Sequence, residues 1–372
     1  MKKLFSNERV NGGRQVELDL AKCLSIIFMI FLHCLMVTGG FNNNVSPVMQ
    51  KAIGQLLGEP FAAPVFMFAM GVGMVYSRNQ APAYLIKRGI SLMLLGLVVN
   101  VGEFFLPHFL AGKLLGASYA EIFPIAGGLL LYCIDILAFA GMAFIVIGMF
   151  KKLKMKPAFM ILIALVFSVT GWILREHDLG NDVLNLVAGY FFGSAGGFTA
   201  FPLFNWLIFP TCGILFGEYY SRCNNKKKLL CLSPVALIVS VTYFVLSWNV
   251  IPNGFLSTTH NYYFMTTIDA VFCLLCIYGV IGLCYFVSLI LPQKLLKFVS
   301  KTSSNLNTIY IIQWFLIPIT YILICFFKKD IVFGNISLVI ISLLEIVAAT
   351  ALASAYKSFV KSRKEKKNEK NS

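Results

Sequence analysis

Long apolar segments alternate with short polar ones along the whole chain. A membrane-spanning helix needs about 20 mainly apolar residues, and ten segments approach that length. They are residues 17–38, 53–77, 84–106, 124–150, 157–174, 203–221, 229–250, 264–291, 305–327 and 331–356. This pattern predicts an all-α, polytopic helical membrane bundle with about ten transmembrane helices.

Basic residues are concentrated in alternate connecting segments. Of the 31 Lys and Arg residues, 25 lie on one predicted side: before the first span, in or beside every second connection, or after the last span. Cytoplasmic loops carry the excess of Lys and Arg, so both termini are predicted to be cytoplasmic. The expected organisation is a cytoplasmic N-terminal segment (1–16), a transmembrane domain (17–356) and a basic cytoplasmic tail (357–372).

The composition excludes a soluble or disordered protein. Hydrophobic residues make up 58% of the chain and charged residues 13%, whereas soluble domains carry about 25% charged residues. The net charge of +15 is explained by the topology, so nucleic acid is not an expected partner. The basic tail is expected to meet anionic lipid headgroups, or to be a solvated stop-transfer tail. Most of the ten cysteines fall inside predicted spans, where they indicate neither a disulfide framework nor a metal site.

Three ionisable residues of the first predicted span are singled out as candidates: Asp19, Lys22 and His33. Charged groups are costly inside a bilayer, so each is a functional hypothesis. Asp19 and Lys22 are three residues apart and are expected to pair on one helix face. Lys22 and His33 are eleven residues apart, which places them on one stripe about 16 Å apart along the axis. The alternatives are an interfacial ion pair and a packing histidine, but the alignment favours a functional His33, whose ordinary pKa suits general-base catalysis.

Further polar residues interrupt the other predicted spans. Three carboxylates, an arginine and three amides exceed what packing of a structural bundle requires, although some are expected to be ordinary packing contacts. These residues are Asp135, Asp269, Arg88, Glu103, Asn305, Asn307 and Gln313.

Several of these motifs, taken in order, resemble the transmembrane acyltransferase superfamily. Asp19-Leu-Ala-Lys22 precedes His33, and PVFMFAMGVG and YLIKRGISLMLLG follow. The later motifs CIDILAFAGMAF, FPLFNWLIFPTCGILFGE and SSNLNTIYIIQW are similar to bacterial heparan-α-glucosaminide N-acetyltransferase-like proteins, while the first set is similar to acyltransferase family three. The resemblance extends from about Arg14 to Ala355. It implies an integral protein of a bacterial cytoplasmic membrane.

The resemblance implies a donor site and a catalytic residue. Acyl-CoA, with acetyl-CoA as the expected co-substrate, would bind from the cytoplasm, and His33 would match the family histidine required for transfer. Lys22 stands where family three has an arginine, and Arg88 matches the basic residue that opens the third span. Lys22, Arg88 and Lys87 are therefore expected to bind the donor phosphates, and Asp19 to position Lys22. Whether His33 acts as a base or is itself acylated stays open.

The resemblance also implies an acceptor on the outer side of the membrane. A hydroxyl or amine of an extracytoplasmic glycan or related small molecule is expected to dock near Asp182, His260, Tyr262 and Asp269. The alternative function is a secondary transporter or exporter of a small solute, lipid or glycan; the absence of a visible internal repeat counts against it. Membrane lipids are the other expected partner, and a homo-oligomer is left open.

Overall fold

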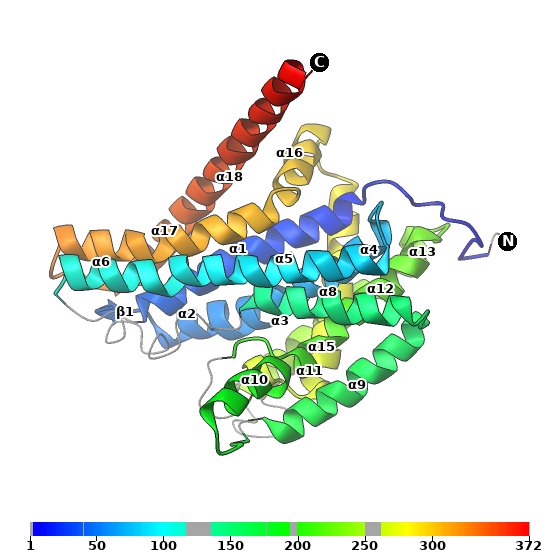
Figure 1. The fold of residues 1–372 in the computed structure, drawn as a ribbon, viewed down its shortest axis with the longest axis horizontal. Helices are drawn as coiled ribbons and strands as arrows, with labels where there is room; N and C mark the ends of the chain where they lie inside the picture. The colour runs from blue at the N-terminus through cyan, green and yellow to red at the C-terminus, as the bar shows by residue number, and fades with distance from the viewer. Residues whose placement is uncertain are drawn as a thin grey trace.

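A computed structural model of the protein describes residues 3–39, 41–116, 135–175, 177–193, 199–249 and 262–371. Most of them are helical and almost none are in strands (Figure 1), which confirms the predicted all-α bundle. The N-terminal part contains α1 (Val16–Thr38), β1 (Asn43–Asn44), α2 (Pro47–Lys51), η1 (Ala52–Gly58), α3 (Glu59–Phe61), α4 (Ala63–Tyr76), α5 (Pro82–Asn100), η2 (Val101–Phe105) and α6 (Leu106–Leu114). Both η1 and η2 are π-helical segments within longer helices.

The rest of the chain continues the helical pattern. The central part contains α8 (Ile136–Lys152), α9 (Pro157–Leu174), α10 (Asp182–Phe192), α11 (Leu203–Trp206), α12 (Ile208–Ser221), α13 (Lys226–Leu229) and α14 (Ser233–Asn249). The C-terminal part contains the 3-10 turn η4 (Tyr262–Phe264), α15 (Thr267–Ser288), α16 (Gln293–Ser303), α17 (Leu306–Phe327), β2 (Phe333–Gly334) and α18 (Asn335–Asn371). The last helix therefore runs without a break through the predicted basic tail.

Eight helices in the described ranges are long and apolar enough to cross a membrane. They correspond to eight of the ten predicted spans, and the protein is thus a multi-pass membrane protein. The predicted span 203–221 is divided into α11 and α12. The predicted span 124–150 is described only in its second part, which forms α8.

The first helix occupies the centre of the bundle. α1 contacts η1, α4, α15, α16, α17 and α18, and it lies alongside α17 in Figure 1. The other tight pairs are α5 with α8, α4 with α12, and α14 with α15. Every polar side chain of α1 that points inward is therefore surrounded by protein.

Connecting segments predicted to share one side of the membrane contact each other. The backbone N–H of Ser6 donates to the carbonyl of Arg222 (2.8 Å), and the N–H of Asn224 donates to that of Leu4 (2.9 Å). At the opposite ends of the helices, β1 pairs in parallel with β2. The connecting segments thus lie on opposite sides of the bundle in the way that the charge pattern predicts. Which of the two sides is cytoplasmic stays a prediction.

The longest predicted outer segment, residues 175–202, contains a helix of its own. Asn181 caps α10 by accepting two backbone N–H bonds of its first turn. Asp178 accepts bonds from the Asn185 side chain (2.7 Å) and a backbone N–H, which together hold the pKa of this exposed carboxyl below its ordinary value. Asp182 lies exposed in the first turn of α10. Local capping therefore organises this segment.

Candidate active site

A basic vestibule opens where α1, α5 and α17 begin and α4 ends. It consists of two adjoining cavities, with about 1410 and 870 Å³ of empty space, which share Lys22, Tyr76 and Ser303 in their walls. Four cationic side chains line the vestibule, against one carboxylate, Asp19. The four are Arg14, Lys22, Arg88 and Lys357. Such a concentration of one sign of charge attracts anions.

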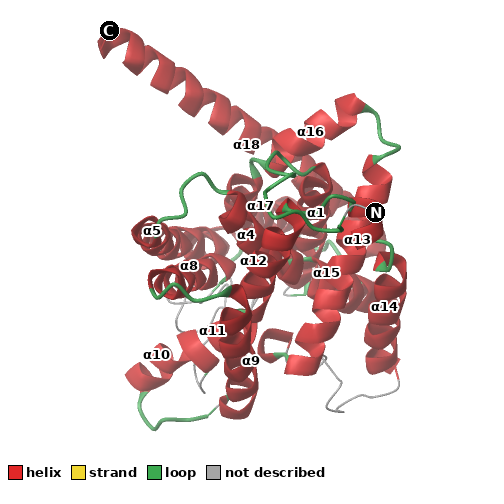
Figure 2. Ribbon diagram, turned by 90° about the vertical axis from the view of Figure 1, so that its right-hand side faces the viewer, coloured by secondary structure: helices red, strands yellow, loops and turns green. Residues whose placement is uncertain are grey.

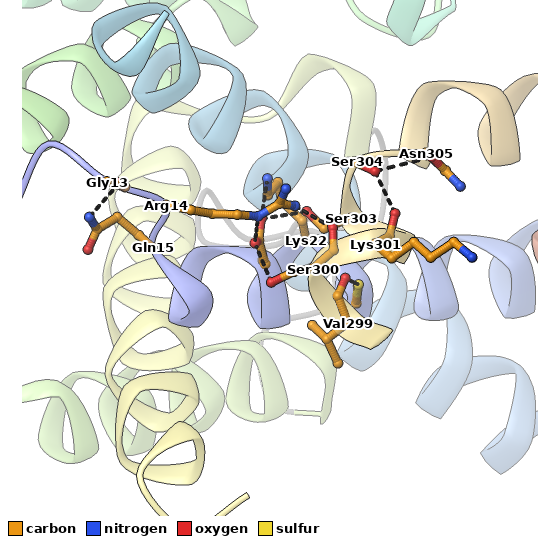
Figure 3. A network of polar contacts seen from close by, with 12 residues as sticks. Gly13, Arg14, Gln15, Lys22, Val299, Ser300, Lys301, Ser303, Ser304 and Asn305 are labelled. Carbon is orange, nitrogen blue, oxygen red and sulfur yellow. Dashed lines mark hydrogen bonds and ion pairs between the residues drawn. The ribbon is translucent and has the colours of Figure 1, made fainter. Parts of the chain in front are cut away.

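Asp19 holds one side of the vestibule together; Figure 3 labels Arg14, Lys22, Ser300 and Ser303, which contact its carboxylate. Its carboxylate pairs with Lys22 (2.9 Å) and with the guanidinium of Arg14. It also accepts hydrogen bonds from the hydroxyls of Ser303 (2.7 Å) and Ser300 (3.1 Å). The predicted Asp19–Lys22 pair is therefore present, with a second cation that the sequence analysis did not assign.

The side chains of Asp19, Lys22 and Arg14 differ in how far they are exposed to solvent. The side chain of Asp19 is 4% exposed, that of Lys22 28% and that of Arg14 50%. A buried carboxylate with several donors is fixed in place, whereas the two cations keep N–H groups facing the vestibule. Asp19 thus orients both cations toward whatever enters.

Arg88 and Lys87 face different surroundings although they are adjacent. Arg88 lines the vestibule, with its guanidinium carbon 5.3 Å from the centroid of the Phe144 ring. Lys87 is exposed and is absent from the vestibule wall. Successive helical residues point about 100° apart, and here Arg88 faces the cavity while Lys87 points away from it.

His33 lies in a separate, deeper cavity with about 580 Å³ of empty space. Its ring stacks on Trp314 of α17, with the ring centroids 4.0 Å apart. Among the described residues, none is in hydrogen-bonding position with His33 Nδ1. The buried carboxyl groups of Glu103 and Asp135 line the same cavity. An imidazole and two carboxyl groups are thereby collected in the wall of one cavity, as in many acid–base sites.

A hydrogen-bonded chain fixes the ring against which His33 stacks. The indole N–H of Trp314 donates to the hydroxyl of Tyr310 (2.9 Å), and this hydroxyl in turn donates to the carboxylate of Asp135. All three side chains are buried. Because each donor has an acceptor, Trp314 is locked and His33 has one well-defined stacking surface.

The deep cavity and the vestibule follow each other along the same helices. Ile136 lines the deep cavity and its neighbour Leu137 lines the vestibule. On α1, the eleven residues from Lys22 to His33 correspond to about 16 Å. Five helical segments contribute to both cavities: α1, α4, α5–η2, α8 and α17. Their residues in the vestibule wall are, in this order, Lys22, Phe66, Arg88, Leu137 and Asn307. Their residues in the deep cavity are, in the same order, His33, Ala63, Glu103, Ile136 and Tyr310.

A comparison with protein-family models gives a single assignment. The model for an acyltransferase domain, that of acyltransferase family three, matches residues 15–355. The chain belongs to acyltransferase family three. No curated protein and no solved structure matches it. The protein is therefore a membrane acyltransferase. The matched region contains the His33 cavity and most of the vestibule wall, and Gly12, Gly13, Arg14 and Lys357 lie just outside it.

The acyltransferase brings some of the predicted site residues together. Lys22, Arg88 and Asn307 line the vestibule, and Asp19 holds its edge. His33, Asp135 and Tyr262 line the deep cavity. The hydroxyl of Tyr262 donates to the carbonyl of Glu59 (2.9 Å), so this ring is tied to the start of α3. The roles of these residues are still proposals.

Other predicted site residues lie outside both cavities. Asp269 forms a reciprocal capping box with Thr266 at the start of α15 and accepts a bond from Tyr243 (2.5 Å). Those contacts are structural. Asn305 precedes α17 as its N-cap residue, and Gln313 is fully buried just before Trp314. Asp182 and Lys87 are exposed, and His260 is outside the described residues.

The sequence analysis missed several residues that complete the two cavities. Arg14 and Lys357 were counted only as topology signals, and Glu103 only as a polar residue near the end of a span. Tyr310 and Trp314 read as ordinary aromatic residues of an apolar helix. A signal existed for the aromatic pair, because i and i+4 share a helix face and both residues carry hydrogen-bonding groups. The described residues contain no group of His, Cys, Asp and Glu that could hold a metal ion.

The vestibule geometry gives a prediction for two adjacent residues of the acyltransferase. Replacing Arg88 by glutamine is expected to weaken CoA binding by about 10- to 100-fold, because a charge-assisted hydrogen bond to phosphate contributes about 1.5–3 kcal/mol. Lys87→Gln removes the same charge one residue away and is expected to change binding by less than about twofold. Isothermal titration of CoA into the protein in nanodiscs measures both. Equal weakening of CoA binding by both variants would contradict the assignment of Arg88, and not Lys87, to the donor site.

Proposed function

We propose that the protein transfers an acyl group, with acetyl as the expected case, from acyl-CoA to a hydroxyl or amine of an extracytoplasmic acceptor such as a glycan. The observation that carries this proposal is the order of the two cavities along α1, a cationic vestibule followed by an enclosed histidine cavity. CoA has the matching shape, with phosphates at one end of a long thin arm and a thioester at the other.

In this proposal the vestibule binds the phosphate end of the donor. Arg14, Lys22, Arg88 and Lys357 supply the positive charge. Lys22 lacks the planar fork that binds phosphate in a bidentate manner, and Arg14, held on the same carboxylate of Asp19, provides such a fork. With the phosphates there, the pantetheine arm extends about 16 Å along α1 to bring the thioester toward His33.

His33 is proposed to act as a general base in the deep cavity. Its imidazole takes the proton from the acceptor hydroxyl or amine while the acceptor atom forms a bond to the thioester carbonyl carbon. The carbon–sulfur bond then breaks, and the CoA thiolate leaves with the proton returned by the imidazolium. Trp314 keeps the ring in one orientation, which supports a fixed geometry for this transfer. A route through an acylated His33 uses the same geometry.

A turnover experiment tests the proposed function. The purified protein is incorporated into nanodiscs and mixed with acetyl-CoA and a panel of sugars, and free CoA and acetylated products are followed by mass spectrometry. Acetyl-CoA-dependent product formation is the expected result. If the protein neither binds nor consumes acetyl-CoA, the donor assignment is wrong. Solute flux in proteoliposomes without CoA would instead support the transporter alternative.

A further inference from the structure

α16 is a short helix that lies across the bundle rather than along it. It connects α15 to α17, and both views show it running crosswise to α1 and α17 (Figures 1 and 2). Leu296, Val299 and Ser303 form its buried face. Their spacing of three and four residues places them on one side of the helix, against α1. The remaining two-thirds of the helix surface faces away from the bundle.

The outward surface of α16 is divided into a cationic and an apolar strip. At 100° per residue, Lys294, Lys297 and Lys301 fall within an arc of about 60°, and Leu295 and Phe298 occupy the next arc of about 60°. All five side chains are exposed. No ion pair to any of the three lysines is present in the described part of the chain. A lysine strip beside an apolar strip is typical of helices that lie in a membrane surface.

The place of α16 in the chain agrees with such a position. The helix follows the span α15 and precedes the span α17, so its ends are fixed at one boundary of the membrane. The two residues at the end of α15, Leu289 and Ile290, are also highly exposed apolar side chains. These side chains need a nonaqueous environment next to the lysines, and only the headgroup and acyl boundary of a bilayer supplies both.

We propose that α16 lies in the membrane surface and binds anionic phospholipid. Lys294, Lys297 and Lys301 contact the phosphate groups, and Leu295 and Phe298 enter the upper acyl region. The positive strip selects anionic over zwitterionic headgroups by charge complementarity. Each lysine is expected to raise the affinity for an anionic surface about fivefold. Three lysines then favour an anionic over a neutral surface on the order of 100-fold at low salt.

Two hydroxyl groups of α16 form hydrogen bonds that connect this helix to the vestibule. Ser300 and Ser303 on α16 both donate to the carboxylate of Asp19 on α1 (Figure 3). The carbonyl of Ser300 also accepts a bond from Arg14. When α16 is held in the membrane surface, the first turns of α1 are held with it. Anionic lipid therefore stabilises the edge of the vestibule as well as α16.

Hydrogen–deuterium exchange in nanodiscs tests this proposal without relying on enzyme activity. The protein is compared in neutral phosphatidylcholine and in a mixture containing about one-third phosphatidylglycerol. Amides of residues 293–303 are expected to exchange at least about tenfold more slowly in the anionic mixture, and those of residues 15–22 to slow in parallel. Added salt at about 0.5 M is expected to remove the difference, because it screens exposed charges.

A matched pair of triple variants identifies the lysines responsible. K294Q/K297Q/K301Q is expected to abolish the lipid-dependent protection. The control variant K152Q/K154Q/K156Q removes three exposed lysines from the end of α8 and the connection to α9. This variant is expected to retain the lipid-dependent protection. Identical exchange of residues 293–303 in the two lipid mixtures would overturn the proposal. Protection in neutral lipid that rises with the number of protein copies per disc would also overturn it, and would assign this surface to a second copy.

Discussion

Replacing His33 by alanine is expected to lower acyl transfer by about 10²- to 10⁴-fold, the contribution typical of a positioned general base. The imidazole is the central group of the deep cavity, with Trp314 stacked on one side and its Nδ1 left without a partner among the described residues. The vestibule lies about 16 Å away along α1, so CoA binding is expected to be unchanged. Product formation and CoA affinity, measured on the same sample, separate the two effects.

His108 provides the matched control for this experiment. It lies exposed on α6, outside both cavities, and His108→Ala is expected to retain full activity. Full activity of the His33 variant would remove the centre of the mechanism. A parallel loss of CoA binding would instead show that the variant disturbs the fold, and a thermal unfolding curve checks this directly.

Replacing Gly71 by alanine is expected to destabilise the protein by about 1–3 kcal/mol or more. A Cβ at Gly71 on α4 would lie 2.0 Å from the carbonyl oxygen of Pro210 on α12, and one at Gly213 on α12 would lie 2.2 Å from that of Phe68 on α4. The obstacle in both cases is backbone, so the two helices must move apart. The midpoint of thermal unfolding in detergent is expected to fall by several degrees, with about 2–4 °C per kcal/mol as a guide.

Gly73 on the same helix is the control. No atom lies within 4 Å of a Cβ built there. Alanine favours a helix over glycine by about 0.8–1.0 kcal/mol, so Gly73→Ala is expected to be neutral or slightly stabilising. The same helix preference acts at Gly71, but there the close packing against α12 outweighs it, so the net effect on stability is unfavourable. Equal midpoints for the two variants would contradict the close approach of α4 and α12. Gly73 lines the vestibule, so the comparison concerns stability alone.

The sequence predicted the helical elements well because the bilayer imposes a simple rule on length and polarity. It did not predict the π-helical segments η1 and η2, the break between α11 and α12, or the helix within residues 175–202. Each of these depends on packing or capping rather than on mean hydropathy. The ends of helices were also inexact, as α5, η2 and α6 form one run of 33 residues where a span over 84–106 was expected.

The candidate site was predictable where one helix carries its residues. The spacing of Lys22 and His33 within α1 fixes their separation, and Asp19 follows from the same periodicity. Partners from distant segments, such as Arg14, Glu103 and Trp314, were not assigned because their approach is decided by how helices pack. The role of Asp269 stays a prediction: its contacts with Thr266 and Tyr243 are those of a helix cap.

The stacking of His33 on Trp314 also has a consequence for biosynthesis. His33 lies in the first helix to be made, and Trp314 and Tyr310 lie in α17, almost 300 residues later. The parallel pair of β1 and β2 joins equally distant segments beyond these helices. A chain that is inserted in the order of its synthesis therefore exposes His33 first and encloses it near the end. A ribosome that stalls before α17 leaves a product that is in the membrane but has no assembled His33 cavity.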